Sequence, residues 1–199
     1  MSARIAFLRH GPTAWNDEGR LQGMTDVPLS PRGRALVATW RVPFEGWRWA
    51  CSPLTRARET AALIGAPPTL AIEPALREMA YGRWEGQTLA DLRAREPEGM
   101  RDAEMRGLDM APPGGESPRQ AMDRLRPWIA MTATRGEDVV AVSHKGLIRV
   151  VLAMATGWDM RSRQPVKLDW DRLHVFTASA DGTLAVDSLN MKLRSEIAA

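Results

Sequence analysis

Residues 4–11 read Arg-Ile-Ala-Phe-Leu-Arg-His-Gly, and this stretch decides the fold. Its apolar run, residues 5–8, predicts a strand, which we place over Arg4–Arg9. Arg9 and His10 stand where that strand ends. Ligands of open α/β sheets bind at the carboxyl ends of the strands. We therefore expect these two side chains to lie where chemistry takes place.

Two further apolar runs end in the same way. Strands are expected over Trp47–Cys51 and Asp138–Val142. The first leads into a helix whose first turn holds Arg56, and the second leads through His144 into an apolar helix. A helix start with free N–H groups and a guanidinium beside it is a ready phosphate site. His174, the third histidine, falls inside an alternating strand pattern and is interpreted as structural.

Helical patterns alternate with these strands, which predicts a layered α/β fold with a mixed sheet and a mostly parallel centre. Three expected helices begin with a serine N-cap followed by proline at the first helical position, at Ser30-Pro31, Ser52-Pro53 and Ser117-Pro118. The expected helices are Pro31–Trp40, Pro53–Ile64, Leu89–Arg95, Pro118–Thr132 and Gly146–Thr156. A C-terminal hairpin is expected from Leu173–Thr177 and Thr183–Leu189, which flank Ala180-Asp181-Gly182.

The composition favours one domain over residues 1–199, because 199 residues with 44% hydrophobic side chains can build one substantial core. An irregular, lid-like insertion is expected around residues 97–116, which are rich in Gly, Pro, Met and charge. Cys51 is the only cysteine, which excludes an internal disulfide and a cysteine-rich metal site and favours a cytoplasmic location.

The charge balance limits the partners. The net charge of +3 is compatible with an anionic substrate. No lysine-rich cluster indicates nucleic-acid binding, and no apolar run reaches the length of a membrane span. No carboxylate cluster for two metal ions is visible either. We expect a small-molecule partner, with no nucleic acid and no membrane.

Four motifs, occurring in the family's order, resemble the histidine phosphatase (phosphoglycerate mutase-like) superfamily. They are Leu8-Arg9-His10-Gly11 with Thr13 and Asn16, Ser52-x-Leu54-x-Arg56-Ala57-x-x-Thr60-Ala61, Leu76-Arg77-Glu78-Met79-Ala80-Tyr81-Gly82-Arg83-Trp84-Glu85-Gly86, and Ser143-His144. The resemblance implies a three-layer α/β/α sandwich and a phosphatase that needs no metal and no cofactor. It implies that His10 is the phosphorylated nucleophile.

The other roles follow from the same resemblance. Arg9, Arg56 and His144 would surround the phosphoryl group, and Glu78 would act as general acid and base, with Glu85 as its nearest rival and more plausibly structural. The residues expected to bind substrate are Thr13, Asn16, Gln22, Gly23 and Lys145. Lys145 follows His144 where relatives carry a small residue, which suggests a substrate with a second anionic group.

Several alternatives stay open at this stage. The short chain and the segments at Tyr81–Gly86 and Pro113–Ser117 resemble the phosphatase branch, including α-ribazole phosphatases and broad-specificity phosphatases. A cofactor-dependent phosphoglycerate mutase is the first alternative, and a non-catalytic member that binds phosphorylated ligands or proteins is the second. The sequence does not identify the substrate, nor does it choose between a monomer and a homodimer.

Overall fold

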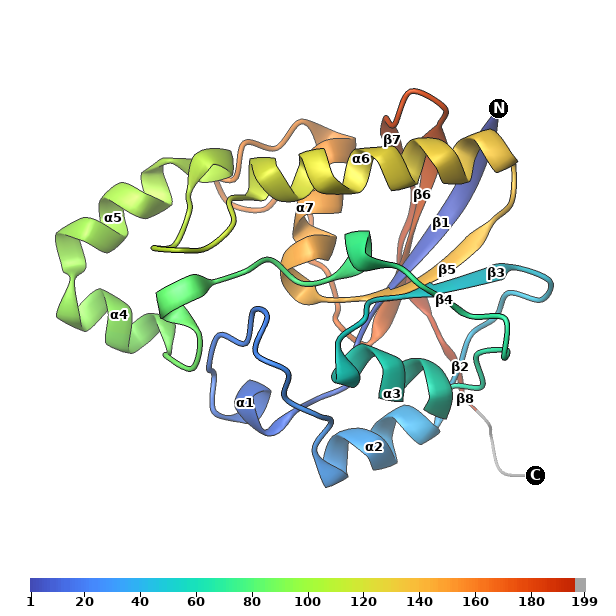
Figure 1. The fold of residues 1–199 in the computed structure, drawn as a ribbon, viewed down its shortest axis with the longest axis horizontal. Helices are drawn as coiled ribbons and strands as arrows, with labels where there is room; N and C mark the ends of the chain where they lie inside the picture. The colour runs from blue at the N-terminus through green and yellow to red at the C-terminus, as the bar shows by residue number, and fades with distance from the viewer. Residues whose placement is uncertain (196–199) are drawn as a thin grey trace.

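The computed structural model describes residues 1–195 and confirms the α/β fold with a mostly parallel central sheet. Six strands are arranged in the order β4-β3-β5-β1-β6-β7 (Figure 1). Their bounds are β1 Ser2–Arg9, β3 Arg48–Cys51, β4 Ala71–Ile72, β5 Val139–Ser143, β6 Arg172–Ser179 and β7 Leu184–Lys192. β1, β3, β4 and β5 run parallel, whereas β6 is antiparallel to both of its neighbours. A second sheet pairs β2 (Trp40–Arg41) with β8 (Arg194–Ser195).

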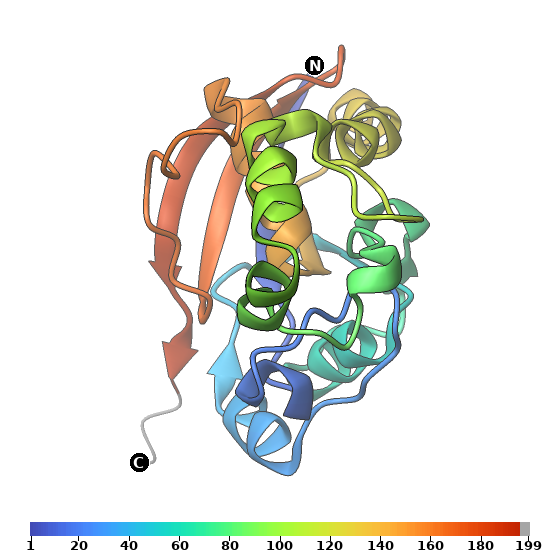
Figure 2. The same cartoon turned by 90° about the vertical axis from the view of Figure 1, so that its left-hand side faces the viewer.

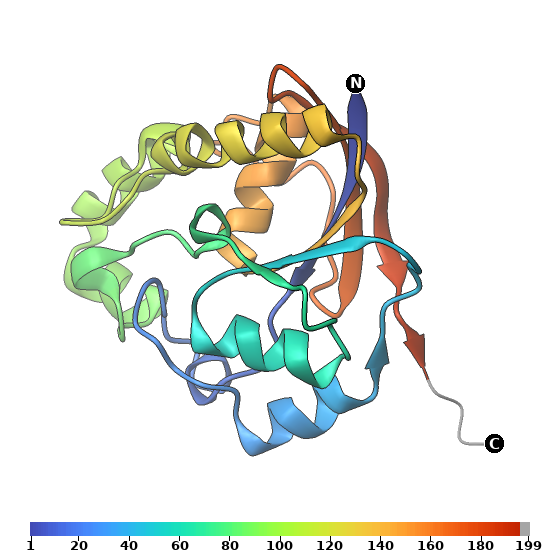
Figure 3. The same cartoon turned by 45° about the vertical axis from the view of Figure 1, so that its right-hand side comes forward.

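Helices cover both faces of the central sheet, which confirms the three-layer arrangement (Figures 1 and 3). The α-helices are α1 Ala14–Asp17, α2 Pro31–Ala38, α3 Thr55–Leu63, α4 Leu89–Arg95, α5 Pro97–Met105, α6 Pro118–Arg135 and α7 Lys145–Thr156. Short 3-10 turns are η1 Pro74–Leu76, η2 Gly82–Trp84 and η3 Gly107–Asp109. α6 and α7 pack on one face, and α2 and α3 pack on the other. None of the helices within residues 1–195 is both long and apolar enough to cross a membrane.

β1 explains why the molecule has two hydrophobic cores. Successive strand side chains point to opposite faces of a sheet. Ile5 and Phe7 accordingly pack in the cluster beneath α6 and α7, where the Phe7 ring meets Trp128 edge to face. Ala6 and Leu8 pack in the cluster beneath α2 and α3. All four β1 side chains are fully buried, so β1 is held from both sides and its carboxyl end is fixed in place.

Two of the three expected serine caps are confirmed. The Ser30 and Ser117 hydroxyls accept backbone N–H bonds at the starts of α2 and α6. The Ser52 prediction is wrong, because α3 begins at Thr55 and its N-cap position is Leu54, which makes no side-chain cap. Ser52 is used for a different contact, described below.

The expectation of an irregular segment over residues 97–116 is wrong in its first half. Pro97–Met105 forms α5, with Pro97 at the first helical position, which a proline tolerates because its missing N–H has no partner there. Together with α4 it forms an arm, defined here as residues 89–105, that projects from the side of the sandwich (Figures 1 and 2). Only the stretch after η3 is irregular.

The C-terminal hairpin is confirmed and is longer than expected. β6 and β7 pair in antiparallel register, and Gly182 in the turn between them has a φ of +80°. That value lies in the left-handed region which glycine adopts without steric cost.

Candidate active site

Three parallel strands end at the same level. Arg9 of β1 pairs in register with Ser143 of β5, and Cys51 of β3 pairs with Val142. The chain continues from these ends into His10, Ser52 and His144. The rings of His10 and His144 lie 5.1 Å apart, centroid to centroid. The structure thus brings three of the four sequence motifs, those that follow the strands, into one buried cluster.

His10 is held in a single orientation and a single tautomer. Its Nδ1 lies 2.7 Å from the Gly11 carbonyl oxygen, and the side chain is only 5% exposed. Because a carbonyl oxygen only accepts, Nδ1 carries the proton and Nε2 keeps its lone pair. Burial, followed by the charges of Arg9 and Arg56, holds the pKa of His10 well below its usual range. The ring is therefore neutral at neutral pH and has a free nucleophilic nitrogen.

Arg56 is fully buried and anchored by the protein itself. Nη1 donates to the Thr25 carbonyl at 2.9 Å, Nη2 to the Gly23 carbonyl at 2.7 Å, and Nε to Nδ1 of His144 at 3.3 Å. Burial lowers the pKa of Arg56, and the charge of Glu78 opposes that effect. A guanidinium has five N–H donors, so two remain for an anion.

His144 is oriented from both sides. Since Arg56 donates to Nδ1, that nitrogen accepts, and Nε2 carries the proton that it donates to the Ser52 hydroxyl at 2.7 Å. Burial, with Arg56 next, holds the pKa of His144 well below its usual range. Ser52 is fully buried and was missed as a site residue. Its place in the second motif was the available signal, but the serine was interpreted as a helix cap.

Arg9 differs from Arg56 in how it is held. Its Nε is buried and has no hydrogen-bond partner within residues 1–195. The guanidinium carbon lies 5.9 Å from the Trp170 ring centroid, and Nζ of Lys145 lies 5.4 Å from the same centroid. Burial lowers the pKa of both cations. Trp170, which sequence analysis did not single out, gathers two positive groups through cation–π contacts and leaves their N–H donors free.

Glu78 lies at the N-terminus of α7 and is 6% exposed. Oε2 accepts from the Gly146 N–H at 2.9 Å, and Oε1 accepts from the N–H groups of Leu147 and Met79 at 3.0 Å each. A helix N-terminus favours a carboxylate through its free N–H groups. A Cβ on Gly146 would lie 2.5 Å from both Glu78 Oε1 and the Tyr81 hydroxyl, so this glycine leaves the space that Glu78 occupies.

Glu85, the rival of Glu78, is engaged by the backbone. Its carboxylate accepts from the N–H groups of Met24, Thr25 and Tyr81 at 2.9 to 3.0 Å. These bonds order the loop whose carbonyls hold Arg56, which is the structural role expected for Glu85.

The expected substrate-binding residues fall into different groups. Thr13 and Asn16 bond to each other as the capping box of α1, with Asn16 Oδ1 accepting from the Thr13 N–H at 3.1 Å. Gln22 is 6% exposed, and its buried Oε1 has no hydrogen-bond partner among the described residues. Gly23 supports Arg56 through its carbonyl oxygen. Lys145 is exposed beside Trp170.

The expected free N–H groups at the start of α3 are not all free. The Thr55 N–H donates to Asp26 Oδ1 at 2.8 Å, and the Thr55 hydroxyl donates to Oδ2 at 2.7 Å. The anion-binding capacity near β3 therefore comes from the Arg56 side chain, because the carboxylate of Asp26 occupies the helix terminus.

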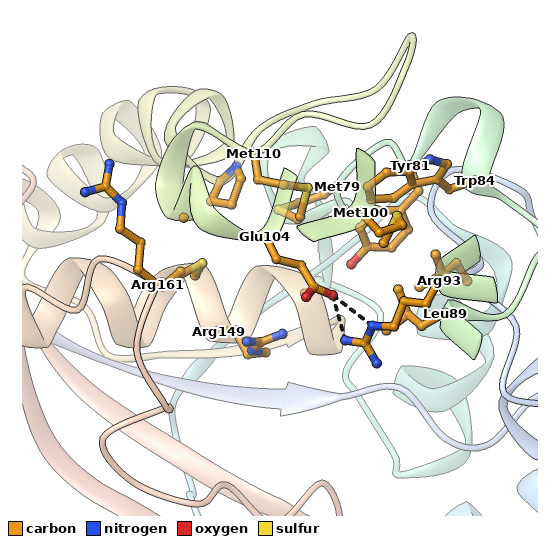
Figure 4. A pocket seen from close by; sticks show the side chains of 15 residues that line it. Met79, Tyr81, Trp84, Leu89, Arg93, Met100, Glu104, Met110, Arg149 and Arg161 are labelled. Atoms are coloured by element: carbon orange, nitrogen blue, oxygen red, sulfur yellow. Dashed lines mark hydrogen bonds and ion pairs between the residues drawn. The ribbon is translucent and has the colours of Figure 1, made fainter. Parts of the chain in front are cut away.

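A cavity of about 350 Å³ adjoins the cluster (Figure 4). Gly146, Tyr81 and Met79 form its near wall, and residues of the arm form the far wall. Burial, with the charge of Glu78 next, raises the pKa of Tyr81 well above its usual range, so the phenol stays protonated. Over residues 1–195, no group of three or more His, Cys, Asp or Glu side chains is placed to hold a metal ion.

Comparisons with known proteins agree with this geometry. The family model of the histidine phosphatase superfamily (branch 1) matches residues 5–191. The chain is 32% identical over 197 residues to "2,3-bisphosphoglycerate-dependent phosphoglycerate mutase 2" of Gloeobacter violaceus, covering 92% of this chain and 89% of the relative. It is 34% identical over 171 residues to a glucosyl-3-phosphoglycerate phosphatase of Mycolicibacterium vanbaalenii, covering 77% and 74%. The crystal structure of the α-ribazole phosphatase from Shigella flexneri has the same fold, with a TM-score of 0.75, 24% identity, and coverage of 97% and 99%.

Proposed function

This chain belongs to the histidine phosphatase superfamily, branch 1, and we propose that it hydrolyses a small phosphate monoester through a covalent phosphohistidine on His10. The observation that carries the proposal is the state of that ring. The Gly11 carbonyl fixes the proton on Nδ1, and the lowered pKa keeps Nε2 unprotonated. A neutral nitrogen in a cationic pocket is the nucleophile that a dianionic phosphate ester requires.

In the first step Nε2 of His10 attacks phosphorus, and the bond from phosphorus to the ester oxygen breaks. Arg9, whose Nε bonds to no described residue, and the two unused N–H groups of Arg56 neutralise the equatorial oxygens. The neutral ring of His144 stands beside the nucleophile; it accepts from Arg56 and donates to Ser52, and so holds the Arg56 guanidinium in place. The two arginines do the electrostatic work that a metal ion does in other phosphoryl-transfer sites.

Glu78 moves the protons. In the first step Glu78 acts as the general acid and holds a proton supplied by solvent. The proton then passes to the departing alkoxide. In the second step water attacks the phosphohistidine, Glu78 takes a proton from that water, the N–P bond breaks, and inorganic phosphate leaves.

The remaining substrate-binding assignments are part of the proposal. Asn16 uses its carbonyl oxygen in the α1 cap, which leaves its amide N–H groups as donors, and Gln22 offers a buried, unused oxygen. Lys145, exposed beside Trp170, adds a positive charge near the cluster and favours a substrate with a second anionic group. Lys145→Ala is expected to lower the preference for bis-phosphorylated over mono-phosphorylated esters; an unchanged preference removes Lys145 from the site. The cytoplasmic location, a homodimer and a lid role for residues 97–116 stay predictions.

A phosphoglycerate mutase remains the second candidate, since a relative that is 32% identical over 92% of the chain carries that name. The two activities share the phosphoenzyme and differ in the acceptor. Conversion of 3-phosphoglycerate in the presence of 2,3-bisphosphoglycerate separates them, and phosphate release without isomerisation is the expected result.

The decisive experiment measures p-nitrophenyl phosphate hydrolysis in excess chelator. The wild type is expected to turn over and, after rapid acid-free quenching, to carry phosphate on His10. His10→Ala is expected to lose both signals. His174→Ala is the matched control, because His174 is also buried but lies within β6. Equal turnover by the His10→Ala variant would refute the assignment, and turnover without any phosphoenzyme in a folded wild type would refute the covalent route.

A further inference from the structure

The cavity lies next to the residues that hold Glu78, the group proposed to protonate the leaving alcohol. The N–H of Gly146 binds the Glu78 carboxylate, and Gly146 itself lines the cavity. An alcohol that receives its proton from Glu78 therefore faces this space. Its volume of about 350 Å³ lies within the range of roughly 300–1,000 Å³ that small-molecule sites have.

The wall of the cavity is strongly apolar. Met100, Met110, Met160 and Trp84 contribute to it, and the tyrosine hydroxyl beside Glu78 and the indole N–H of Trp84 are the only neutral polar side-chain groups in the lining formed by the described residues (Figure 4). No serine, threonine, asparagine or glutamine lines this space within residues 1–195. Sugar hydroxyls placed against these apolar side chains would lose hydrogen bonds to water without replacement, which costs free energy for each group. The lining therefore favours an apolar or aromatic alcohol.

The backbone of Met160 supports the inference that this wall contacts a ligand. Its φ is +61°, a left-handed value that non-glycine residues adopt only at an energetic cost. The side chain reaches the cavity from this conformation. Flexible, polarisable methionines adapt to the outline of an apolar ligand.

The charged groups of the lining are not balanced. Arg93 and Glu104 neutralise each other across the arm at 2.6 Å (dashed in Figure 4). Two arginines of the lining, Arg149 and Arg161, have no ion pair with a described residue. Arg149 is the one that projects from α7, one turn after Gly146. Its Nε is buried without a hydrogen-bond partner, and its guanidinium carbon lies 5.3 Å from the ring centroid of the buried Trp158. The cation is thus positioned by an aromatic ring and keeps its donors unused.

We propose that this cavity binds the alcohol part of the substrate, and that this alcohol is a largely apolar or aromatic group carrying a carboxylate that pairs with Arg149. The inference rests on the proposed function, because it concerns the leaving group of the same reaction. A carboxylate fits the planar guanidinium with two parallel hydrogen bonds. Apolar contact and one charge pair together define the substrate class.

The test compares kcat/KM for phenyl phosphate, its 3- and 4-carboxyphenyl analogues, and glucose 6-phosphate. Phenyl phosphate is expected to exceed glucose 6-phosphate by at least about tenfold, because most of the cavity wall is apolar and offers no partner to sugar hydroxyls. At least one carboxyphenyl ester is expected to exceed phenyl phosphate by about tenfold to a hundredfold, the range of a charge-assisted hydrogen bond. Comparable rates for glucose 6-phosphate and phenyl phosphate would overturn the apolar part of the proposal.

Arg149→Met tests the charge pair. The ratio of the carboxyphenyl to the phenyl ester is expected to fall to near unity, and Arg149→Lys is expected to keep an intermediate ratio. The ratio cancels any loss of stability or activity common to both esters. Arg101→Met, an exposed arginine of α5 outside the cavity lining, is the matched control and is expected to keep the wild-type ratio. An unchanged ratio in Arg149→Met overturns the pairing.

Failure of this inference is distinguishable from failure of the proposed function. If His10→Ala abolishes hydrolysis of every ester and the preferences are absent, the phosphohistidine route stands and the substrate class is wrong. If His10→Ala retains hydrolysis, the chemistry itself is misassigned.

Discussion

The strand-end cluster and the α4–α5 arm face each other across one cavity, but different interactions hold them. Buried hydrogen bonds hold the cluster, and an exposed ion pair is the main polar contact of the arm. In the cluster, Arg56 is fully buried and makes three hydrogen bonds, and Glu78 accepts three backbone N–H groups. In the arm, the main polar contact is the exposed ion pair between Arg93 and Glu104. Removing one of the buried hydrogen-bonding groups of the cluster would lower the stability of the protein. Replacing exposed side chains of the arm would change the cavity wall with little loss of stability.

This difference separates two tasks. Phosphoryl transfer needs charges held within a fraction of an ångström, which buried hydrogen bonds provide. Choice of leaving group needs only shape and polarity, which exposed helices with methionine side chains provide. Substitutions in the cluster should therefore alter rate and stability together, and substitutions in the arm should alter preference among substrates.

The largest effect is expected from Arg56→Met. It removes two phosphate donors and leaves the Gly23 and Thr25 carbonyls without their partner. We expect kcat/KM to fall by about a thousandfold and the free energy of unfolding by about 3 kcal/mol. Steady-state kinetics and urea unfolding measure the two quantities.

Arg9→Met is the matched variant within the cluster. Arg9 is held by the Trp170 ring, and its buried Nε bonds to no described residue. Its loss is expected to reduce kcat/KM by about a hundredfold or more while the free energy of unfolding changes by less than about 1 kcal/mol. If both variants lost equal stability, the contrast between anchored and free arginines would be wrong.

A pair of glycine substitutions compares the two regions directly. The Cβ of Gly146→Ala would meet Glu78 and Tyr81 at 2.5 Å, so the carboxyl must move. We expect kcat to fall by about a hundredfold, the scale of a misplaced general acid. Gly99→Ala in α5 meets nothing nearer than 3.9 Å and should leave kcat unchanged, with helix stability raised by up to about 1 kcal/mol. Equal kcat in both variants would remove Glu78 from the mechanism.

Acid should destabilise the cluster before it affects the arm. The pKa values of His10 and His144 are lowered by burial, so below the ordinary histidine pKa of about 6.5 the unfolded chain binds protons that the native chain refuses. The contribution of the two neutral histidines to the free energy of unfolding is complete above that pH. The free energy of unfolding should fall on acidification by up to about 1.4 kcal/mol per pH unit for each such histidine.

His174, whose pKa is lowered to about 4 by burial, adds to the acid sensitivity with the same sign. Urea unfolding between pH 7.5 and 5 checks the slope, and His10→Gln should make it shallower by the share of one histidine. A wild-type stability that stayed flat or rose over this range would show that the two cluster rings are protonated in the native state.

The sequence predicted the cluster well because its signals are local. Arg9, His10 and His144 each follow an apolar strand directly, and parallel strands bring their carboxyl ends together without further information. Ser52 was placed in the correct motif with the wrong task. Its hydroxyl could cap α3 or meet His144, and only the packing of β3 against β5 decides between these partners.

Residues that reach the site from parts of the chain far from the four motifs carried no such signal in the sequence. Trp170 and Arg149 enter the site through loops and helices distant in sequence, and neither stands in a pattern that marks it. The arm was misjudged for another reason. Glycine, methionine and charge over 97–116 suggested an irregular lid, but Pro97 occupies the first helical position, a start signal that outweighed composition.

The smallest effect is expected at the ion pair of the arm. Arg93 and Glu104 are 56% and 45% exposed, so solvent screens their attraction, and Glu104→Gln should change the free energy of unfolding by less than about 0.5 kcal/mol. The same substitution leaves Arg93 as a third unbalanced cation in the cavity, beside Arg149 and Arg161. The ratio of carboxyphenyl to phenyl ester hydrolysis should therefore rise, by about twofold to fivefold, since an exposed charge contributes up to roughly 1 kcal/mol.

Glu98→Gln, an exposed residue of α5 outside the cavity lining, removes the same charge from the arm and should leave that ratio unchanged. A rise in both variants would point to the net charge of the arm instead of the cavity wall. A large loss of stability in Glu104→Gln alone would mean that the arm is as firmly fixed as the cluster. We expect Glu104→Gln to change the preference between the two esters while stability and phosphoenzyme formation stay as in the wild type. That combination would show that the arm selects the alcohol and that the cluster transfers the phosphoryl group.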